Sequence, residues 1–150
     1  MTETPKPGDR AVVDHIFTAA DVADFARLSG DHNPIHTDAG AARAAGFDRE
    51  VVHGVLLTSL ISRLLGTQLP GPGTILLGQD VRFRRPVLVG DRIRACVEVT
   101  TVRDDKPVIS LRSWVELEAS GEVALDGTST VLLRPTSAAG GSETGRGAGA

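Results

Sequence analysis

The segment GDHNPIHTD, residues 30–38, places Asp31 and His36 five positions apart, and both side chains can accept and release protons. A carboxylate beside an imidazole is a common arrangement for holding a water molecule and moving its proton. Because Pro34 lacks a backbone N–H and biases Asn33 away from helical backbone angles, we expect residues 31–36 to cross as an irregular loop. Such a loop can turn both side chains toward one point, and the Asn33 amide can fix it through Asx-type hydrogen bonds.

Two plainer explanations fit the same residues. Asp31 and Asn33 are common turn formers, so they can serve the turn alone, with His36 incidental. A metal site is the second alternative, with ligands drawn from Asp31, His32, His36 and Asp38. The short proline-containing loop makes simultaneous ligation awkward, and the sequence has no second cluster of ligands. We therefore predict that no metal ion is bound.

The segment VVHGVLLTSL, residues 51–60, offers a second set of polar groups. Gly54 is expected in the first turn of a helix, where backbone N–H groups lack partners and the helix dipole is positive. A glycine there lets a ligand approach the backbone, and an N–H aimed at a carbonyl oxygen stabilises an enolate as an oxyanion hole does. Taken alone, Gly54 fits a packing glycine and His53 a structural histidine. Asp31 and His36 upstream give weight to the functional interpretation.

Arginines recur at strand spacing in GQDVRFRRPVLVGDRIRA, residues 78–95. Any one of them fits a strand face exposed to solvent. A ligand that carries phosphates, such as coenzyme A or the phosphopantetheine of a carrier protein, would use one or two of them. The candidates are Arg82, Arg84, Arg92 and Arg94, and we favour Arg82 and Arg84.

Three helices are expected before Gly73. The first begins at Thr18, presents an apolar stripe on one face, and ends at Gly30. The second runs from Asp38 to Ala45 and is capped by Thr37 or Asp38. The third, residues 54–69, is apolar almost all the way round, so it must be buried on most sides.

After Gly73 the apolar residues alternate with a period of two, which predicts strands. Strands are expected around residues 81–83, 93–99, 109–117 and 123–133, joined by short turns as a four-stranded meander, and an early strand at 10–17 can join the sheet. The economical packing is a curved antiparallel sheet wrapped around the third helix, which is the α+β hot-dog architecture. One sheet edge would be left exposed, so we expect a dimer formed through it.

Composition excludes several functional classes. The 150 residues fit one domain, with 41% hydrophobic residues. A net charge of -3 argues against non-specific nucleic-acid binding. No apolar run approaches the ~20 residues that span a bilayer, and the first ten residues do not resemble a secretory signal. The single cysteine, Cys96, excludes an intrachain disulfide.

We therefore expect a cytoplasmic protein without membrane insertion and without nucleic-acid partners. Its expected domains are an extended arm at residues 1–8, the folded domain at 9–135, and a disordered Gly/Ala/Ser-rich tail at 136–150.

From about Gly8 to Pro135, the chain resembles the MaoC-like (R)-specific enoyl-CoA hydratases, also called hydratase 2. The likeness is carried by SGDHNPIHTD, VVHGVLLTSLISRLLG, LGQDVRFRRPVLVGD and DDKPV. It is nearest to the single-domain enzymes that feed polyhydroxyalkanoate synthesis from fatty acid metabolism. The resemblance implies a hot-dog fold, a homodimer and an acyl-thioester substrate, with no cofactor beyond the coenzyme A of that substrate.

The resemblance also implies a role for each matching residue. Asp31 and His36 would be the catalytic dyad that activates one water, with Asn33 supporting it. Water would add reversibly, on one face, to a trans-2-enoyl thioester and give an (R)-3-hydroxyacyl thioester, while the Gly54 N–H polarises the thioester carbonyl. The positions that match the family's acyl pocket are Ser62, Leu65 and Thr130.

The chain departs from the family pattern at His32, where relatives often have an aromatic residue, and at Thr130, where an apolar one is expected. The main alternative activity is dehydration of a (3R)-hydroxyacyl carrier protein in fatty-acid or polyketide synthesis. A thioesterase is disfavoured because residues 54–69 contain no Asp or Glu. The intact dyad disfavours a non-catalytic acyl-binding subunit, although the chain could be the catalytic half of a heterodimer.

Overall fold

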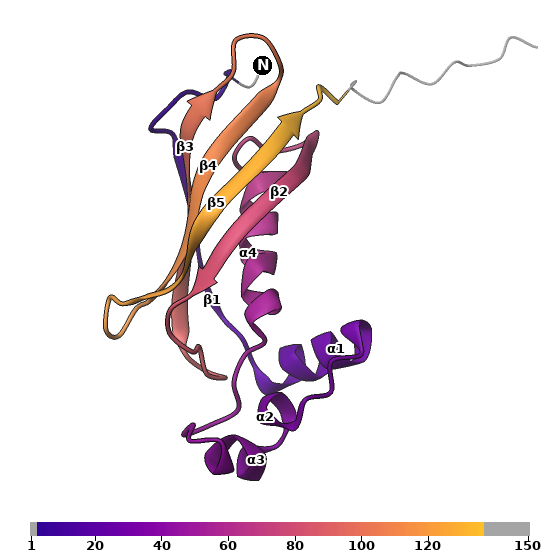
Figure 1. Ribbon diagram of the computed structural model, residues 1–150, viewed down its shortest axis with the longest axis vertical. Helices are drawn as coiled ribbons and strands as arrows, with labels where there is room; N and C mark the ends of the chain where they lie inside the picture. The colour runs from indigo at the N-terminus through magenta and orange to yellow at the C-terminus, as the bar shows by residue number, and fades with distance from the viewer. Residues whose placement is uncertain (1–2, 137–150) are drawn as a thin grey trace, which may run out of the picture.

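The computed structural model describes residues 3–136, so all of the expected tail except Thr136 lies outside the described residues. Figure 1 shows the path of the chain. In chain order the elements are β1 (Arg10–Ile16), α1 (Ala19–Ser29), α2 (Pro34–Thr37), α3 (Ala39–Ala44), α4 (Gly54–Thr67), β2 (Thr74–Phe83), β3 (Arg92–Val102), β4 (Val108–Leu117) and β5 (Val123–Leu133).

The strands of residues 3–136 form one antiparallel sheet in the order β1-β3-β4-β5-β2. The predicted meander of four consecutive strands is therefore wrong in part. Only β3, β4 and β5 follow one another, while β2 lies beyond β5 at one edge and β1 pairs with β3 at the other. The period of two reports which face of a strand a side chain occupies, and it carries no information about which strand lies alongside.

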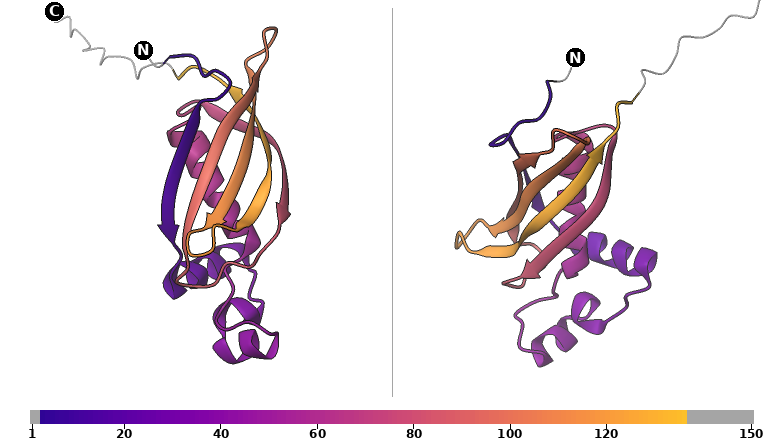
Figure 2. Two further views of the ribbon diagram at one scale, coloured as in Figure 1. Left: turned by 90° about the vertical axis from the view of Figure 1, so that its left-hand side faces the viewer. Right: turned by 45° about the horizontal axis from the view of Figure 1, so that its top comes forward.

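Helix α4 lies across the concave face of the curved sheet (Figure 2). Its buried residues are Leu56, Leu57, Leu60, Ile61, Leu64 and Leu65. They pack against the inward-facing residues of the strands, such as Ile93, Leu111 and Val131, each no more than 1% exposed. Burying a side chain of this kind contributes about 1.5–3 kcal/mol, so this interface supplies much of the fold's stability. The predicted hot-dog architecture is confirmed.

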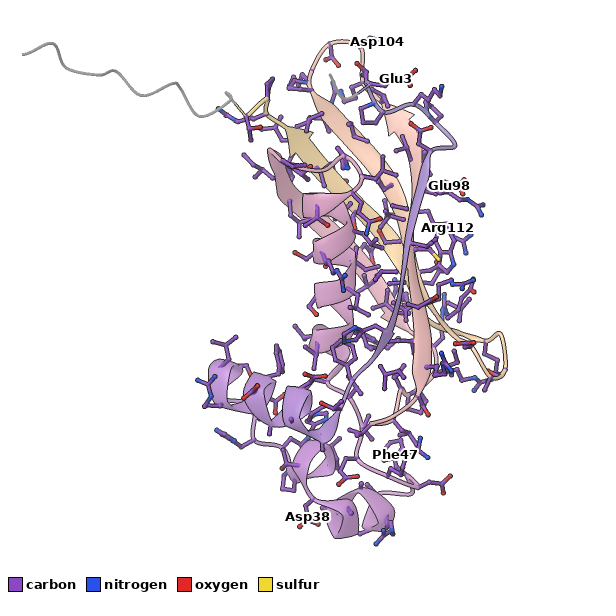
Figure 3. All side chains as sticks on the ribbon, turned by 180° about the vertical axis from the view of Figure 1, so that it is seen from behind. Glu3, Asp38, Phe47, Glu98, Asp104 and Arg112 are labelled. Carbon is purple, nitrogen blue, oxygen red and sulfur yellow. The ribbon has the colours of Figure 1, made fainter. Side chains whose placement is uncertain are left out.

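The short helices α1, α2 and α3 gather beyond the N-terminal end of α4, at the lower end of the molecule in Figure 1. This places residues 30–38 next to the first turn of α4. In Figure 3, Asp38 and Phe47 mark this end of the molecule, and Glu3 and Asp104 mark the other. Among the described residues, no helix is long and apolar enough to cross a membrane.

The convex face of the sheet carries charged pairs between neighbouring strands. Figure 3 shows Glu98 and Arg112 on the side away from α4. Arg94 lies 2.7 Å from Asp14 on the neighbouring strand. The hydrogen bond from Arg94, together with its charge, holds the pKa of the Asp14 carboxyl below its usual value.

Candidate active site

The loop that carries Asp31 begins where α1 ends. Thr18 caps α1 as part of a capping box, with its side chain accepting from the Asp21 N–H. At the other end, Gly30 adopts a left-handed backbone (φ 79°), and its N–H donates to the Ala26 carbonyl at 2.9 Å. A glycine takes this conformation without strain, so the chain can turn sharply just before Asp31.

The segment that carries His36 is one turn of helix, which corrects the expectation of an irregular loop throughout. Pro34 occupies the first turn of α2, where a missing N–H costs nothing and its fixed φ suits the helix. Asn33 caps this turn by accepting from the Ile35 N–H at 3.5 Å, and its own N–H donates to Asp31 Oδ1 at 3.2 Å. Asn33 thus ties Asp31 to the helix that presents His36.

Asp31 and His36 face one another across a gap that fits one water molecule. Asp31 Oδ2 lies 4.0 Å from His36 Nε2, which is too far for a direct hydrogen bond and close enough for both atoms to contact the same water. His36 is 9% exposed, whereas half of the Asp31 side-chain surface is accessible.

A backbone contact fixes the orientation of the His36 ring. Its Nδ1 lies 2.6 Å from the Val51 carbonyl oxygen, which can only accept, so the neutral ring carries its proton on Nδ1. Val51 is itself held in place because its N–H donates to the Ile35 carbonyl and it bridges to Leu88. His36 Nε2 is therefore left as a proton acceptor aimed at the gap beside Asp31.

Gly54 opens α4 beside this pair. The helix has no side-chain cap at His53. Among the described residues the Gly54 and Val55 N–H groups have no hydrogen-bond partner, whereas the Leu56 N–H donates to the His53 carbonyl at 3.0 Å. His36 and Gly54 both line a cavity of about 270 Å³, together with Leu57 and Phe83. An added Cβ on Gly54 would lie 2.9 Å from the Phe83 ring, so a side chain at this position would displace that ring.

Two of the three predicted acyl-pocket residues share a second hollow. Ser62 and Leu65 line a space of about 100 Å³ between α4 and β2, together with Thr74 and Leu76. Ser62 lies eight positions after Gly54 in α4, which is roughly 12 Å along the helix axis.

Thr130 does not join this hollow. Its neighbours Ser129 and Val131 are buried on the α4 side of β5, so alternation puts Thr130 on the convex face. Thr130 is therefore not retained as an acyl-pocket residue.

The two favoured arginines have different positions. Val81 packs against the core, so Arg82, the next residue of β2, points to the convex face and away from the cavity. Arg84 follows the end of β2 and lines the cavity with His36 and Gly54. Arg85 also lines it and lies 3.4 Å from Glu122. Arg92 lies 3.3 Å from Glu118 and Arg94 2.7 Å from Asp14.

The four metal ligands considered from the sequence are not brought together. Asp38 caps α3, with Oδ1 accepting from the Ala41 N–H at 2.7 Å, and His32 is exposed. A different group, Asp31, His36 and His53, places one possible ligand atom from each residue within 4.8 Å of the others.

The hydrogen bond of His53 weakens that group as a metal centre. Its Nε2 lies 3.2 Å from the Asp31 carbonyl oxygen, so Nε2 carries the proton. Binding a metal there would move that proton to Nδ1, which is buried without a hydrogen-bond partner among the described residues.

With this geometry in view, comparison with known proteins identifies the family. The family model of the MaoC like domain matches residues 2–119. The chain belongs to the MaoC-like domain family. The chain is 48% identical to the (R)-specific enoyl-CoA hydratase of Aeromonas caviae over 126 residues, covering 84% of this chain and 93% of that protein.

Two further matches support the family assignment. The MaoC-like fold superposes on the solved structure titled (R)-hydratase from A. caviae involved in PHA biosynthesis, with a TM-score of 0.85, 45% identity and coverage of 89% of this chain and 100% of that one. The mitochondrial 3-hydroxyacyl-[acyl-carrier-protein] dehydratase of Arabidopsis thaliana is 32% identical over 130 residues, covering 85% of this chain and 77% of that protein.

Three residues of the MaoC-like site were not assigned to it from the sequence. Arg85 and Phe83 line the cavity, and the ring of His53 stacks on the ring of His36. The sequence signal for His53 is its position directly before the helix-opening glycine. Arg85 and Phe83 carry no comparable signal. Phe83 is the last residue of β2 and Arg85 lies beyond the strand, and alternation alone does not show that either side chain lines a cavity.

Proposed function

We propose that this chain is an (R)-specific enoyl-CoA hydratase, a hydro-lyase that adds water reversibly to trans-2-enoyl-CoA and gives (R)-3-hydroxyacyl-CoA. The observation that carries the proposal is the 4.0 Å gap between Asp31 Oδ2 and His36 Nε2, which adjoins the cavity that Gly54 also lines. The 48% identity to the A. caviae enzyme over most of both chains supports the same reaction.

The first step is proton removal from a water held between Asp31 and His36. His36 Nε2 takes a proton from this water, because the hydrogen bond from Nδ1 to Val51 leaves Nε2 unprotonated. The water oxygen forms a bond to Cβ of the enoyl group. The π electrons of the Cα–Cβ bond shift to form an enolate, with negative charge on the thioester oxygen.

The second step returns the proton. The Gly54 N–H at the positive end of α4 stabilises the enolate oxygen until the proton passes from the dyad to Cα. Because the dyad lies on one side of the substrate, hydroxyl and proton arrive on the same face. The sum is one molecule of water added, and dehydration follows the same path in reverse.

The carrier of the acyl group separates this activity from its main alternative. The likeness to the Arabidopsis dehydratase favours a 3-hydroxyacyl-carrier-protein dehydratase as the second candidate. Phosphopantetheine is common to both carriers, and coenzyme A adds an adenine nucleotide with further phosphates. Arg84 and Arg85 beside the cavity are our candidates for phosphate contacts. A thioesterase is less well supported, because α4 contains neither Asp nor Glu.

We also propose that the enzyme works as a homodimer in the cytoplasm, where CoA thioesters are available. The edge strand β2 exposes Ile75, Leu76 and Leu77, each with 45% or more of its surface accessible. An apolar strand edge of this kind favours pairing with another chain. Light scattering should give twice the 15.7 kDa chain mass. A monomeric mass would instead favour assembly with a different chain, as in a heterodimer.

The test of the function is a hydration assay with trans-2-enoyl thioesters of increasing chain length on coenzyme A and on acyl carrier protein. We expect the enoyl absorbance to fall with the CoA series, and chiral analysis to give the (R)-3-hydroxyacyl product. A preference for the carrier-protein series would support the dehydratase. No loss of absorbance with either series, or an (S) product, would exclude the proposed activity.

A further inference from the structure

His53 contacts both Asp31 and His36, although it is not a member of the catalytic pair. It is the residue before α4 and is 2% exposed. Its ring stacks on the ring of His36, with the centroids 3.7 Å apart and the planes 25° from parallel. The edge of Phe25 packs against it from another side, with the ring centroids 4.7 Å apart. The stack with His53 thus holds the orientation of the His36 ring, and Phe25 holds the His53 ring in turn.

The hydrogen bond of His53 reaches the other member of the pair. Its Nε2–H donates to the backbone carbonyl of Asp31 at 3.2 Å. The same Nε2 lies 4.0 Å from Asp31 Oδ2, which matches the distance from that oxygen to His36 Nε2. The imidazole of His53 therefore contacts both the main chain of Asp31 and the ring of His36.

The remaining nitrogen of His53 defines its protonation state. Nδ1 is buried and is the one buried side-chain nitrogen or oxygen without a hydrogen-bond partner in the part of the chain that the structure describes. A proton on Nδ1 would have no acceptor, and a buried donor without an acceptor costs about 1–3 kcal/mol. His53 is thus suited to donate through Nε2 and unsuited to exchange protons through Nδ1.

We propose that His53 is a positioning residue, which sets the separation of Asp31 and His36 through its Nε2–H bond and its ring stack. This role rests on the proposed hydratase function. His53 does not touch the reacting atoms in this account, so its loss should change the rate of the chemical step more than substrate binding. Misplacing a catalytic group by about 1 Å can cost roughly 10²-fold in rate.

Two substitutions separate the hydrogen bond from the stack. His53→Phe keeps an aromatic ring and removes the donor, whereas His53→Gln keeps an N–H donor at a similar reach and removes the ring. We expect His53→Phe to lower kcat for crotonyl-CoA about 10- to 100-fold with KM changed less than about twofold. His53→Gln should recover part of that loss. His32→Phe, at an exposed histidine that neighbours Asp31, is the matched control and should keep the wild-type rate.

Thermal unfolding of each variant shows whether it is folded. A folded His53→Phe protein with wild-type kcat would overturn the proposal. So would a folded His53→Gln protein with wild-type kcat, because the ring stack would then be irrelevant.

A measurement without substrate separates this inference from the proposed function. Long-range ¹H–¹⁵N spectra of the wild-type histidine rings at neutral pH should show His53 protonated on Nε2 and His36 protonated on Nδ1. Protonation of His53 on Nδ1 would refute the proposed hydrogen bond from His53 Nε2 to the Asp31 carbonyl, whether or not the protein is active. An inactive wild-type protein with the expected protonation would refute the hydratase and leave the His53 geometry standing.

Discussion

Replacing Gly54 by alanine tests whether the first turn of α4 binds the substrate carbonyl. The added Cβ would lie 2.9 Å from Cε1 and 3.0 Å from Cζ of Phe83, closer than such atoms pack. Phe83 is 53% exposed, so its ring can swing away and the chain should still fold. The methyl group and the displaced ring would then crowd the N–H that the thioester oxygen is proposed to approach.

The expected loss follows from what an oxyanion-hole donor contributes. Removing one such donor costs about 10²–10³ in kcat. Stability should change little, because alanine favours a helix by up to about 1 kcal/mol over glycine and the displaced ring offsets part of that gain. We therefore expect Gly54→Ala to lose at least tenfold in kcat for crotonyl-CoA while Tm stays within a few degrees of the wild-type value.

Two controls make the result interpretable. Gly66→Ala, in the same helix, places its Cβ in open space and reports the effect of helix propensity on Tm. Gly54→Ala combined with Phe83→Ala removes the ring, so recovery of the rate in the double variant would assign the loss to the ring. A folded Gly54→Ala protein with wild-type kcat would refute the role of Gly54.

Further predictions follow from the pockets and the convex face. Ser62→Phe fills the hollow roughly 12 Å from Gly54 along α4, so the hydration rate of octenoyl-CoA should fall relative to that of crotonyl-CoA. Arg84→Ala should raise KM several-fold for crotonyl-CoA and leave it unchanged for crotonyl-N-acetylcysteamine, which has no phosphate. Arg94 lowers the pKa of Asp14 from its ordinary 3.8, so Arg94→Leu should raise the pKa of Asp14 in an NMR titration. The stability contributed by that pair is present above pH 3.8 and is lost as the pH falls through the lowered pKa, so the Tm difference between wild type and variant should shrink there.

Each of these predictions has a matched comparison. Arg63→Phe adds the same ring one residue from Ser62 at an exposed position, and it should not change the chain-length preference. Arg82→Ala removes an arginine of the convex face and should leave both KM values unchanged. An equal effect of Arg82→Ala and Arg84→Ala would contradict the assignment of the phosphate contact. A pKa of Asp14 that does not move in Arg94→Leu would contradict the ion pair.

The helices and the faces of the strands were predictable because they depend on local patterns. Thr18 and Gly30 bound α1 as expected, and Asp38 caps α3. The sequence does not predict the one-turn helix α2. Proline breaks a helix in its interior, and the local pattern does not show that Pro34 stands in the first turn, where proline is favoured.

Features that depend on long-range packing were not predictable in the same way. The alternation of apolar and polar residues along β2 is the same whether that strand pairs with β3 or with β5. The predicted four-stranded meander therefore includes β2 beside β3, whereas in the structure β2 pairs with β5. Thr130 was assigned to the acyl pocket from the resemblance alone, and a shift of one residue along a strand exchanges the two faces. The stacking of His53 on His36 joins residues 17 positions apart and has no local signature.

The central claim is that Asp31 and His36 together activate one water for addition to an enoyl thioester. The most direct test is the initial rate of crotonyl-CoA hydration by the wild type, Asp31→Asn and His36→Ala at equal concentrations of folded protein. General acid–base groups supply about 10²–10⁴-fold each, so each variant should lose at least two orders of magnitude in kcat while retaining the wild-type oligomeric state. A folded Asp31→Asn or His36→Ala protein that hydrates crotonyl-CoA at close to the wild-type rate would contradict the claim.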